Sequence, residues 1–363
     1  MWPNNSIASP LGIDTPIIQA PMILQRSLVP LAAAVCNSGG LGSLGCAEMS
    51  VEELEHSIDE MRLATNNPFN LNFFLHQTPK FETEIDAKVR NFLKPFYDKL
   101  DLEFPTDTAS TELETFGEPI LELLLKKRPK LVSFHFGCPS NEVVDHLKSA
   151  GILVATTATT VNEAIAIEKA GADFVVAQGW EAGGHRGSFL SGYEETGIGT
   201  MSLVPQVVDA VGIPVIASGG IGDGRGIAVA FALGAQGVWM GTAFLSCFEA
   251  PITPIHRQTL LTANDEDTHL SRAFSGRPCR ARKTPYSLSI AENRPELHDF
   301  PLMYNYSSPL KKHGIENDDL EYQFLLYGQS AALNQEMTAA DLIDKLSVDA
   351  AKVLQGFGSS QTR

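Results

Sequence analysis

The chain has 363 residues, of which 44% are hydrophobic and 19% are charged, and its formal net charge is −16 at pH 7. This composition is typical of a globular enzyme, and the length allows a barrel-sized domain with an appendage. The acidity argues against nucleic acid as a partner, and no apolar run is long enough to span a membrane.

Short apolar runs alternate with helical stretches along most of the chain, which is typical of β/α units and a parallel sheet. Eight parallel strands with helices between them close into a barrel, and the residues after each strand then face one mouth. We therefore predict an α/β fold, a TIM (β/α)8 barrel with a mainly helical insertion after the eighth strand. The eight predicted strands are Pro16–Gln19, Leu41–Leu44, Leu71–Leu75, Leu131–Phe136, Ile152–Ala155, Phe174–Ala177, Pro214–Ala217 and Val238–Met240.

Helix signals lie between the predicted strands. Thr160 and Glu163 have the spacing of a capping box at the start of a helix over Val161–Ala170. A second helix is predicted over Arg225–Leu233, and it ends at Gly234.

The connection from Leu75 to Leu131 is too long for one crossover helix. Its helical stretch Phe81–Leu100 and apolar segment Pro119–Leu125 are expected to pack on the outside of the barrel. Beyond the last strand, strand periodicity is weak and Pro, Arg and Asn are frequent. We expect the domains to be a TIM barrel over 1–245, a helical insertion or lid over 246–321, and a helical segment over 322–363 that returns to the barrel.

The five cysteines are odd in number and form no CxxC pair, which indicates reduced thiols and neither a disulfide framework nor a zinc site. The first residues lack a basic stretch followed by an apolar core. Together these features favour a cytoplasmic protein, with an organelle as the alternative. The basic group Arg277, Arg280, Arg282 and Lys283 is interpreted as a solvated loop face, with local attraction of an anionic substrate as the alternative.

The segment Ala177–Gly187 is the most informative, because it places His185 among glycines directly after a predicted strand. Histidine titrates near neutral pH, so His185 is the candidate for proton transfer; a loop histidine bonded to a carbonyl is the alternative. His135 also lies near a strand end, and its role can equally be functional or structural. Glu181 and Arg186 are expected to pair and hold the loop.

Two further glycine groups follow predicted strands. Gly219 and Gly220 come after Ser218, and Gly241 precedes Thr242. Glycine lets an anion approach the backbone N–H groups, so these groups predict a phosphate-bearing cofactor beside a histidine base. The amides of Gln178 and Asn72, near two more strand ends, suit hydrogen bonds to a flat heterocycle or are satisfied core amides.

With these motifs the chain resembles the nitronate monooxygenase family, formerly called 2-nitropropane dioxygenase, in its class I type. The resemblance rests on Gln19–Met22 with Asn37–Leu44, on Ala177–Gly187, on Pro214–Leu245, and on Tyr327–Ala331. It implies an FMN-dependent TIM barrel that oxidises alkyl nitronates such as propionate 3-nitronate, with nitroalkanes as a further substrate class. The reaction uses O2 and yields an aldehyde or ketone and nitrite.

Carried over by position, the resemblance implies that His185 is the base that removes the α-proton of a neutral nitroalkane. The positions that match FMN contacts are Ala20, Pro21, Met22, Asn72, Gln178, Gly183, Ser218, Gly219, Gly220, Trp239, Met240, Gly241 and Thr242. The substrate positions are His135, Tyr304, Gln329 and Ser330, and no metal is implied. The expected partners are the nitronate or nitroalkane and O2, without nucleic acid or membrane, in a monomer or homodimer.

Two alternatives stay open. FMN-dependent enoyl reductases and NAD(P)H:quinone reductases share the phosphate loops and a related GGH block. Arg186 after His185, and Glu181-Ala182 before the glycines, favour the nitronate type. A flavin-binding barrel without turnover is the alternative of another class, because a fold and a cofactor site do not guarantee activity.

Overall fold

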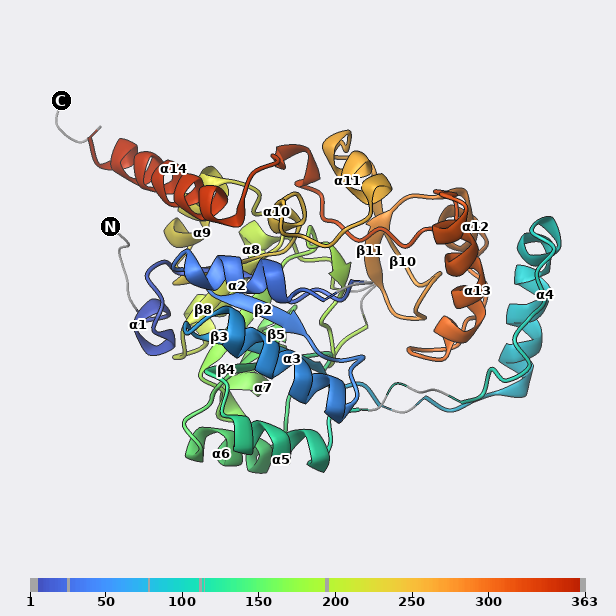
Figure 1. The fold of residues 1–363 in the computed structure, drawn as a ribbon, viewed down its shortest axis with the longest axis horizontal. Coiled ribbons are helices and arrows are strands. Elements are labelled where there is room, and N and C mark those ends of the chain that lie inside the picture. The colour runs from blue at the N-terminus through green and yellow to red at the C-terminus, as the bar shows by residue number, and fades with distance from the viewer. Residues whose placement is uncertain are drawn as a thin grey trace.

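The computed structural model describes residues 6–24, 27–77, 79–110, 113, 115–192 and 196–359, so the first five residues lie outside it. Eight parallel strands form its centre, each with ends within three residues of the predicted ones. They are β1 Ile17–Gln19, β2 Gly42–Gly45, β3 Phe69–Phe74, β4 Leu131–His135, β5 Leu153–Ala158, β6 Phe174–Gln178, β8 Val215–Ser218 and β9 Gly237–Met240. Their order is β1-β9-β8-β6-β5-β4-β3-β2, and a bridge from Ile18 to Leu41 joins β1 to β2. The predicted TIM barrel is confirmed (Figure 1).

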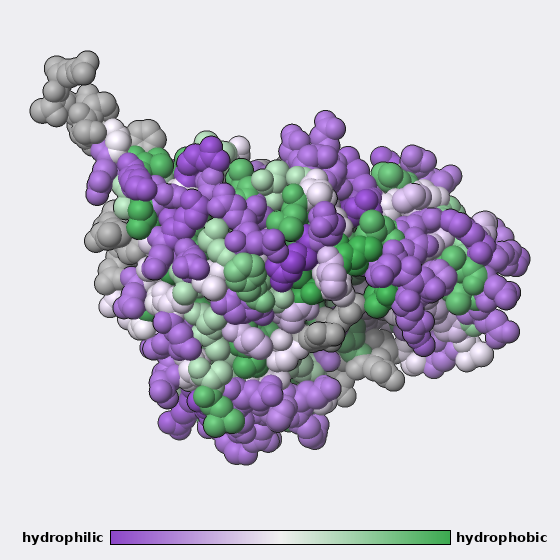
Figure 2. Space-filling model, turned by 45° about the horizontal axis from the view of Figure 1, so that its top comes forward, coloured by the Kyte–Doolittle hydropathy of each residue, from purple (hydrophilic) through white to green (hydrophobic). Residues whose placement is uncertain are grey.

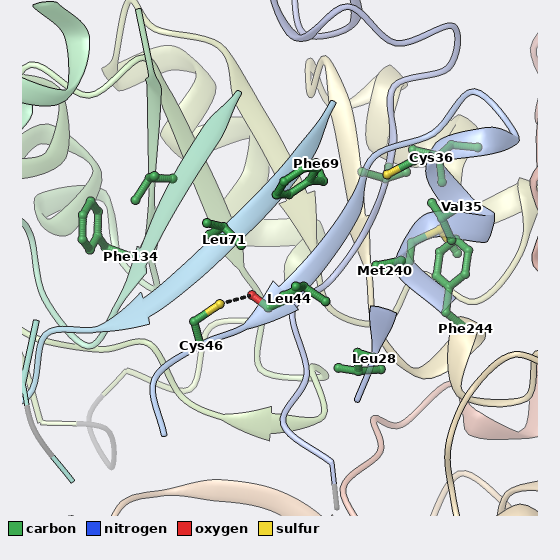
Figure 3. Packing of buried hydrophobic residues seen from close by; sticks show 14 of the residues in the cluster. Leu28, Val35, Cys36, Leu44, Cys46, Phe69, Leu71, Phe134, Met240 and Phe244 are labelled. Carbon is green, nitrogen blue, oxygen red and sulfur yellow. Dashed lines mark hydrogen bonds between the residues drawn. The ribbon is translucent and has the colours of Figure 1, made fainter. Parts of the chain in front are cut away.

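Helices cover the outside of the barrel. They are α2 Val29–Asn37, α3 Val51–Ala64, α5 Glu118–Lys127, α6 Asn141–Ser149, α7 Val161–Lys169, α8 Thr200–Ala210, α9 Gly224–Ala232 and α14 Ala339–Ser359. Outward side chains such as Leu44 and Leu71 form the layer under these helices, in one hydrophobic cluster with Cys36 of α2 (Figure 3). Inward side chains such as Phe174 and Ile216 form a separate core with residues at the short helix α1, Ala8–Leu11. Successive side chains of a strand point to opposite faces of the sheet, so the barrel has one core inside and another between the strands and the outer helices.

The capping box predicted for α7 is wrong in one half. The Thr160 hydroxyl accepts the Glu163 N–H at 3.2 Å, as expected. The Glu163 carboxylate, however, accepts bonds from the N–H of Thr159 at 2.6 Å and from those of Phe189 and Leu190 at 2.6 and 3.0 Å. A fully buried carboxylate finds more donors there than at the helix start, and it ties the loop after β7 to the barrel.

A second unit stands beside the barrel (Figure 1). Helix α4, Thr83–Lys99, packs there against α12, Pro285–Asn293, and α13, Met303–Glu316, around an aromatic core. The core residues are Val89, Leu93, Tyr97, Ala273, Phe274, Tyr286, Ile290, Leu297, Met303, Tyr306, Leu310 and Tyr322. The expectation that both helices of the long connection cover the barrel is therefore confirmed for α5 and wrong for α4. The reason is that the apolar face of α4 matches the aromatic residues of the segment after β9.

The segment after β9 is mainly helical, with α10 Thr242–Leu245, α11 Pro254–Leu261, α12 and α13. It also contains a hairpin of β10 Thr268–Ser271 and β11 Cys279–Arg282, and β11 pairs with the short strand β7, Gly184–His185. The 3-10 helix η2, Ala331–Leu333, and α14 follow.

The visible surface is mainly hydrophilic, with hydrophobic residues in small groups (Figure 2). Within the ranges that the structure covers, no helix has the length and apolar character needed to span a bilayer.

Candidate active site

A cavity of about 1350 Å³ opens at the carboxyl ends of the barrel strands. Each of the eight strands contributes a wall residue from its last positions or from the loop that follows. These residues are Ala20, Gly45, Asn72, His135, Thr157, Gln178, Ser218 and Met240. Pockets for one drug-sized molecule measure roughly 300–1,000 Å³, so this cavity has room for a cofactor and a small substrate together.

The structure brings almost all of the sequence-predicted site residues to this cavity. The lining includes Ala20, Pro21, Met22, Asn72, His135, Gln178, Gly183, His185, Ser218, Gly219, Gly220, Trp239, Met240, Gly241, Thr242, Tyr304 and Ser330. Gln329 is the exception, because it does not line the cavity, and its N–H donates to the Glu181 carbonyl at 3.1 Å.

The two glycine groups lie on neighbouring strands, after β8 and β9. Gly219 and Gly220 have φ angles of +100° and +71°, a region that favours glycine. Within the described residues, the N–H groups of Gly220 and Thr242 donate to no protein acceptor. The Thr242 hydroxyl accepts the Gly328 N–H at 2.9 Å and keeps its own proton for another acceptor. This end of the cavity is suited to an anion such as a phosphate.

The two strand-end amides are partly engaged within the protein. Asn72 donates to the Ser133 hydroxyl at 2.9 Å. Gln178 uses both ends of its amide on the following loop, because its Nε2 donates to the His185 carbonyl at 3.0 Å and its Oε1 accepts the Gly187 N–H at 2.9 Å. Gln178 therefore fixes the loop that carries His185 while it lines the cavity.

His185 lies in β7 and pairs with Cys279 of β11. Its ring is surrounded edge-on by aromatic rings at centroid distances of 5.5 to 6.3 Å, namely those of Phe74, Phe136, Phe300 and Phe324. Nε2 lies 2.9 Å from the Ser275 hydroxyl. Burial among these rings, together with the neighbouring His135, Arg277 and Lys311, lowers the pKa of His185 to about 3. The imidazole is thus neutral at pH 7 and able to accept a proton.

His135 supports the same loop. Its Nε2 lies 3.1 Å from the His185 carbonyl, which can only accept, so Nε2 carries the proton. Burial lowers the pKa of His135 to about 3, so this ring is neutral as well. The bond to the His185 carbonyl supports a structural role for His135. Because His135 also lines the cavity, a contact with the substrate stays a prediction.

Three arginines hold the His185 loop through its carbonyl groups. Arg186 donates to the Gln178 and Gly179 carbonyls at 3.1 and 2.7 Å. Arg280 donates to the Trp180 carbonyl, and Arg277 donates to the Ser188 carbonyl. The solvated-face interpretation is wrong for Arg280, which is 3% exposed, and for the half-buried Arg277.

The predicted Glu181–Arg186 pair is also wrong. The Glu181 carboxylate instead accepts a hydrogen bond from the Thr200 hydroxyl at 2.9 Å, while Arg186 donates to the Gln178 and Gly179 carbonyls. Carbonyl groups at the end of β6 are closer partners for the guanidinium than the carboxylate is.

Helix α13 contributes a further wall with Tyr304, Ser308 and Lys311. The Lys311 ammonium lies 4.3 Å from the centre of the Tyr304 ring. Burial lowers the pKa of Lys311 to about 8, although the charge of Glu48, which also lines the cavity, opposes this shift. Sequence reasoning missed Lys311 and Glu48; the signal for Lys311 was its spacing of seven residues from Tyr304, which places both on one helical face.

Comparisons with known proteins agree with this geometry. The family described as "Nitronate monooxygenase" matches residues 7–349. A probable nitronate monooxygenase of Staphylococcus haemolyticus is 38% identical over 348 residues, which cover 95% of this chain and 97% of that protein. One of Staphylococcus aureus (strain Newman) is 39% identical over 335 residues, or 92% of this chain and 93% of that protein.

Among solved structures, a nitroalkane oxidase from Streptomyces ansochromogenes superposes with a TM-score of 0.89 at 35% identity, covering 96% of this chain and 99% of that one. FabK from Thermotoga maritima superposes with a TM-score of 0.76 at 28% identity, covering 98% of both chains. The extent of these matches shows that the chain belongs to the nitronate monooxygenase family and is an oxidoreductase of that family.

Proposed function

We propose that this protein uses FMN and O2 to oxidise alkyl nitronates to an aldehyde or ketone and nitrite. The observation that carries the proposal is the position of a neutral histidine, His185, in the same cavity as the backbone amides of Gly220 and Thr242, which are unpaired within the described residues. Family membership and the likeness to a nitroalkane oxidase support the same substrate class.

The residues present fit FMN. The glycine loops after β8 and β9 would hold its phosphate, and the strand ends with Asn72 and Gln178 would face its ring system. When bound, FMN supplies the redox chemistry, taking electrons from the nitronate and passing them to O2.

The protein's own residues bind and position the substrate. The nitronate is an anion, and Lys311 is the single lysine or arginine among the described residues that line the cavity. Lys311 therefore supports an anionic substrate on the α13 wall. The aromatic rings around His185 exclude water and hold the imidazole in place.

A neutral nitroalkane requires one more step, because it must first lose its α-proton. His185 is neutral at pH 7 and can take this proton. The C–H electron pair then moves into the C=N bond of the nitronate, and the negative charge goes to the nitro oxygens. That anion stabilises the protonated imidazole beside it.

The test is to mix the purified protein with propionate 3-nitronate or ethylnitronate in air and to follow O2 uptake and nitrite. Nitrite in proportion to the O2 consumed supports the proposal. The second candidate function is an FMN-dependent enoyl or quinone reductase, for which the likeness to FabK is the supporting observation. Rapid anaerobic bleaching of the yellow protein by NADH or NADPH, without nitrite from nitronates, would favour that reductase. Bound flavin without either reaction would favour a non-catalytic flavin-binding barrel.

A further inference from the structure

The ring of His185 has two nitrogens in different surroundings. Nε2 is 2.9 Å from the hydroxyl of Ser275, a residue that is 1% exposed. Nδ1 has no hydrogen-bond partner among the described residues, and it is not among the fully buried polar atoms. Because His185 lines the cavity, Nδ1 is the nitrogen that a substrate can reach.

The bonds of Ser275 determine where the imidazole proton sits. Its Oγ accepts the Arg277 N–H at 3.3 Å and donates its single proton to the Arg277 carbonyl at 3.1 Å. A serine hydroxyl has one proton, so Oγ has none left for His185. The short contact with Nε2 is then a bond in which Nε2 donates and Oγ accepts.

The turn that holds Ser275 is itself fixed. The Gly276 N–H donates to the Arg272 carbonyl at 2.9 Å, and the Arg272 Nε donates to the Gly276 carbonyl at 2.7 Å. Gly276 has a φ of +81°, and a Cβ at this position would lie 2.4 Å from the His298 carbonyl oxygen. The Arg277 side chain is also anchored, on the Ser188 carbonyl. The acceptor for the Ser275 proton is therefore held in place.

We propose that Ser275 is a positioning residue that keeps the neutral His185 in the Nε2–H tautomer, so that Nδ1 presents its lone pair to the substrate. This inference rests on the proposed base role of His185 and deepens it. In the reaction the substrate C–H bond breaks, the proton joins Nδ1, and the electron pair remains in the nitronate. Nε2 keeps its proton throughout, and its bond to Ser275 persists in the imidazolium.

The tautomer can be measured directly on the resting holoenzyme. With ¹⁵N-labelled histidine, the nitrogen shifts of His185, assigned by their loss in a His185→Asn variant, distinguish Nε2–H from Nδ1–H. We expect Nε2–H in the wild type and a shift toward Nδ1–H in Ser275→Ala, where the acceptor is gone. A wild-type His185 with its proton on Nδ1 would overturn the inference, whatever the enzyme turns over.

Kinetics give the second readout. Ser275→Ala is expected to lower kcat/KM for nitroethane by roughly 10- to 100-fold, since part of the general-base contribution is lost. Its kcat/KM for ethylnitronate should change much less, because no proton is removed, and Ser275→Thr should restore most of the nitroethane rate. An equal loss on both substrates in Ser275→Ala would mean that Ser275 only maintains the fold.

The chain offers a matched control in a second serine–histidine pair, because the Ser287 hydroxyl lies 2.8 Å from Nε2 of the half-buried His269 and neither residue lines the cavity. Ser287→Ala should leave the ratio of the two rates unchanged, and a change as large as that of Ser275→Ala would overturn the inference. If the wild type turns over neither substrate, the proposed function fails, while the NMR measurement still decides the tautomer.

Discussion

Replacing His185 by asparagine separates proton abstraction from the later steps of the reaction. Burial lowers the pKa of His185 and keeps its imidazole neutral at pH 7, whereas asparagine cannot accept a proton, so the variant loses the general-base contribution. General-base catalysis contributes about 10²- to 10⁴-fold, or roughly 2.7 to 5.4 kcal/mol of barrier. We expect kcat/KM for nitroethane to fall by this factor.

The same variant should oxidise ethylnitronate at a rate close to that of the wild type, because this substrate has already lost its proton. The assay is the initial rate of nitrite release at pH 7 with each substrate, on protein with a full complement of flavin. Asparagine is smaller than histidine and leaves the aromatic surround in place. Equal losses of kcat/KM on nitroethane and ethylnitronate would refute the assignment of His185 as the base.

Three further predictions follow from the buried charges. Burial lowers the folded-state pKa of His256 and His269 to about 4, below the ordinary 6.5, so the unfolded chain binds more protons than the folded protein between these values. The free energy of unfolding should therefore fall from pH 6.5 toward pH 4, by up to about 2 kcal/mol per histidine at pH 5. Thermal unfolding across this pH range checks the prediction, and a flat profile would contradict it. Glu163→Gln replaces a fully buried carboxylate that accepts bonds from three backbone N–H groups, and it should lower the free energy of unfolding in urea by about 3 kcal/mol. An unchanged urea midpoint would show that these bonds to the loop after β7 do not stabilise the fold. Lys311→Met should raise the KM for ethylnitronate and for propionate 3-nitronate about 10-fold, since both are anions, and should change the KM for neutral nitroethane much less. An equal rise for nitroethane would argue against this role.

The barrel was predictable because its signals are local. A buried parallel strand is a continuous apolar run, and the residues after it must lie at the mouth, as Gly219 and Thr242 do. His185 stood out for the same reason, as a titratable side chain among glycines just beyond β6.

The supports of the site were not predictable, because they depend on pairing between distant segments. Ser275 meets His185 through the β7–β11 ladder, 90 residues apart in the chain. Arginine is usually a surface residue, and the burial of Arg280 is tolerable because its guanidinium donates to the Trp180 carbonyl and to the Thr268 hydroxyl. The prediction that α4 covers the barrel was wrong for a similar reason, since an apolar helical face indicates burial but not the core in which the helix is buried.

The core of the second unit combines α4, which lies between β3 and β4 in the chain, with the segment that follows β9. The Tyr97 hydroxyl donates to the Tyr306 carbonyl at 2.6 Å, across 209 residues of chain. During synthesis at about 5–20 residues per second, α4 would wait roughly 10–40 s for α13 to leave the ribosome. Through that interval its apolar face lacks its partners from α12 and α13, so hydrophobic surface of α4 stays exposed on the nascent chain until translation has passed α13.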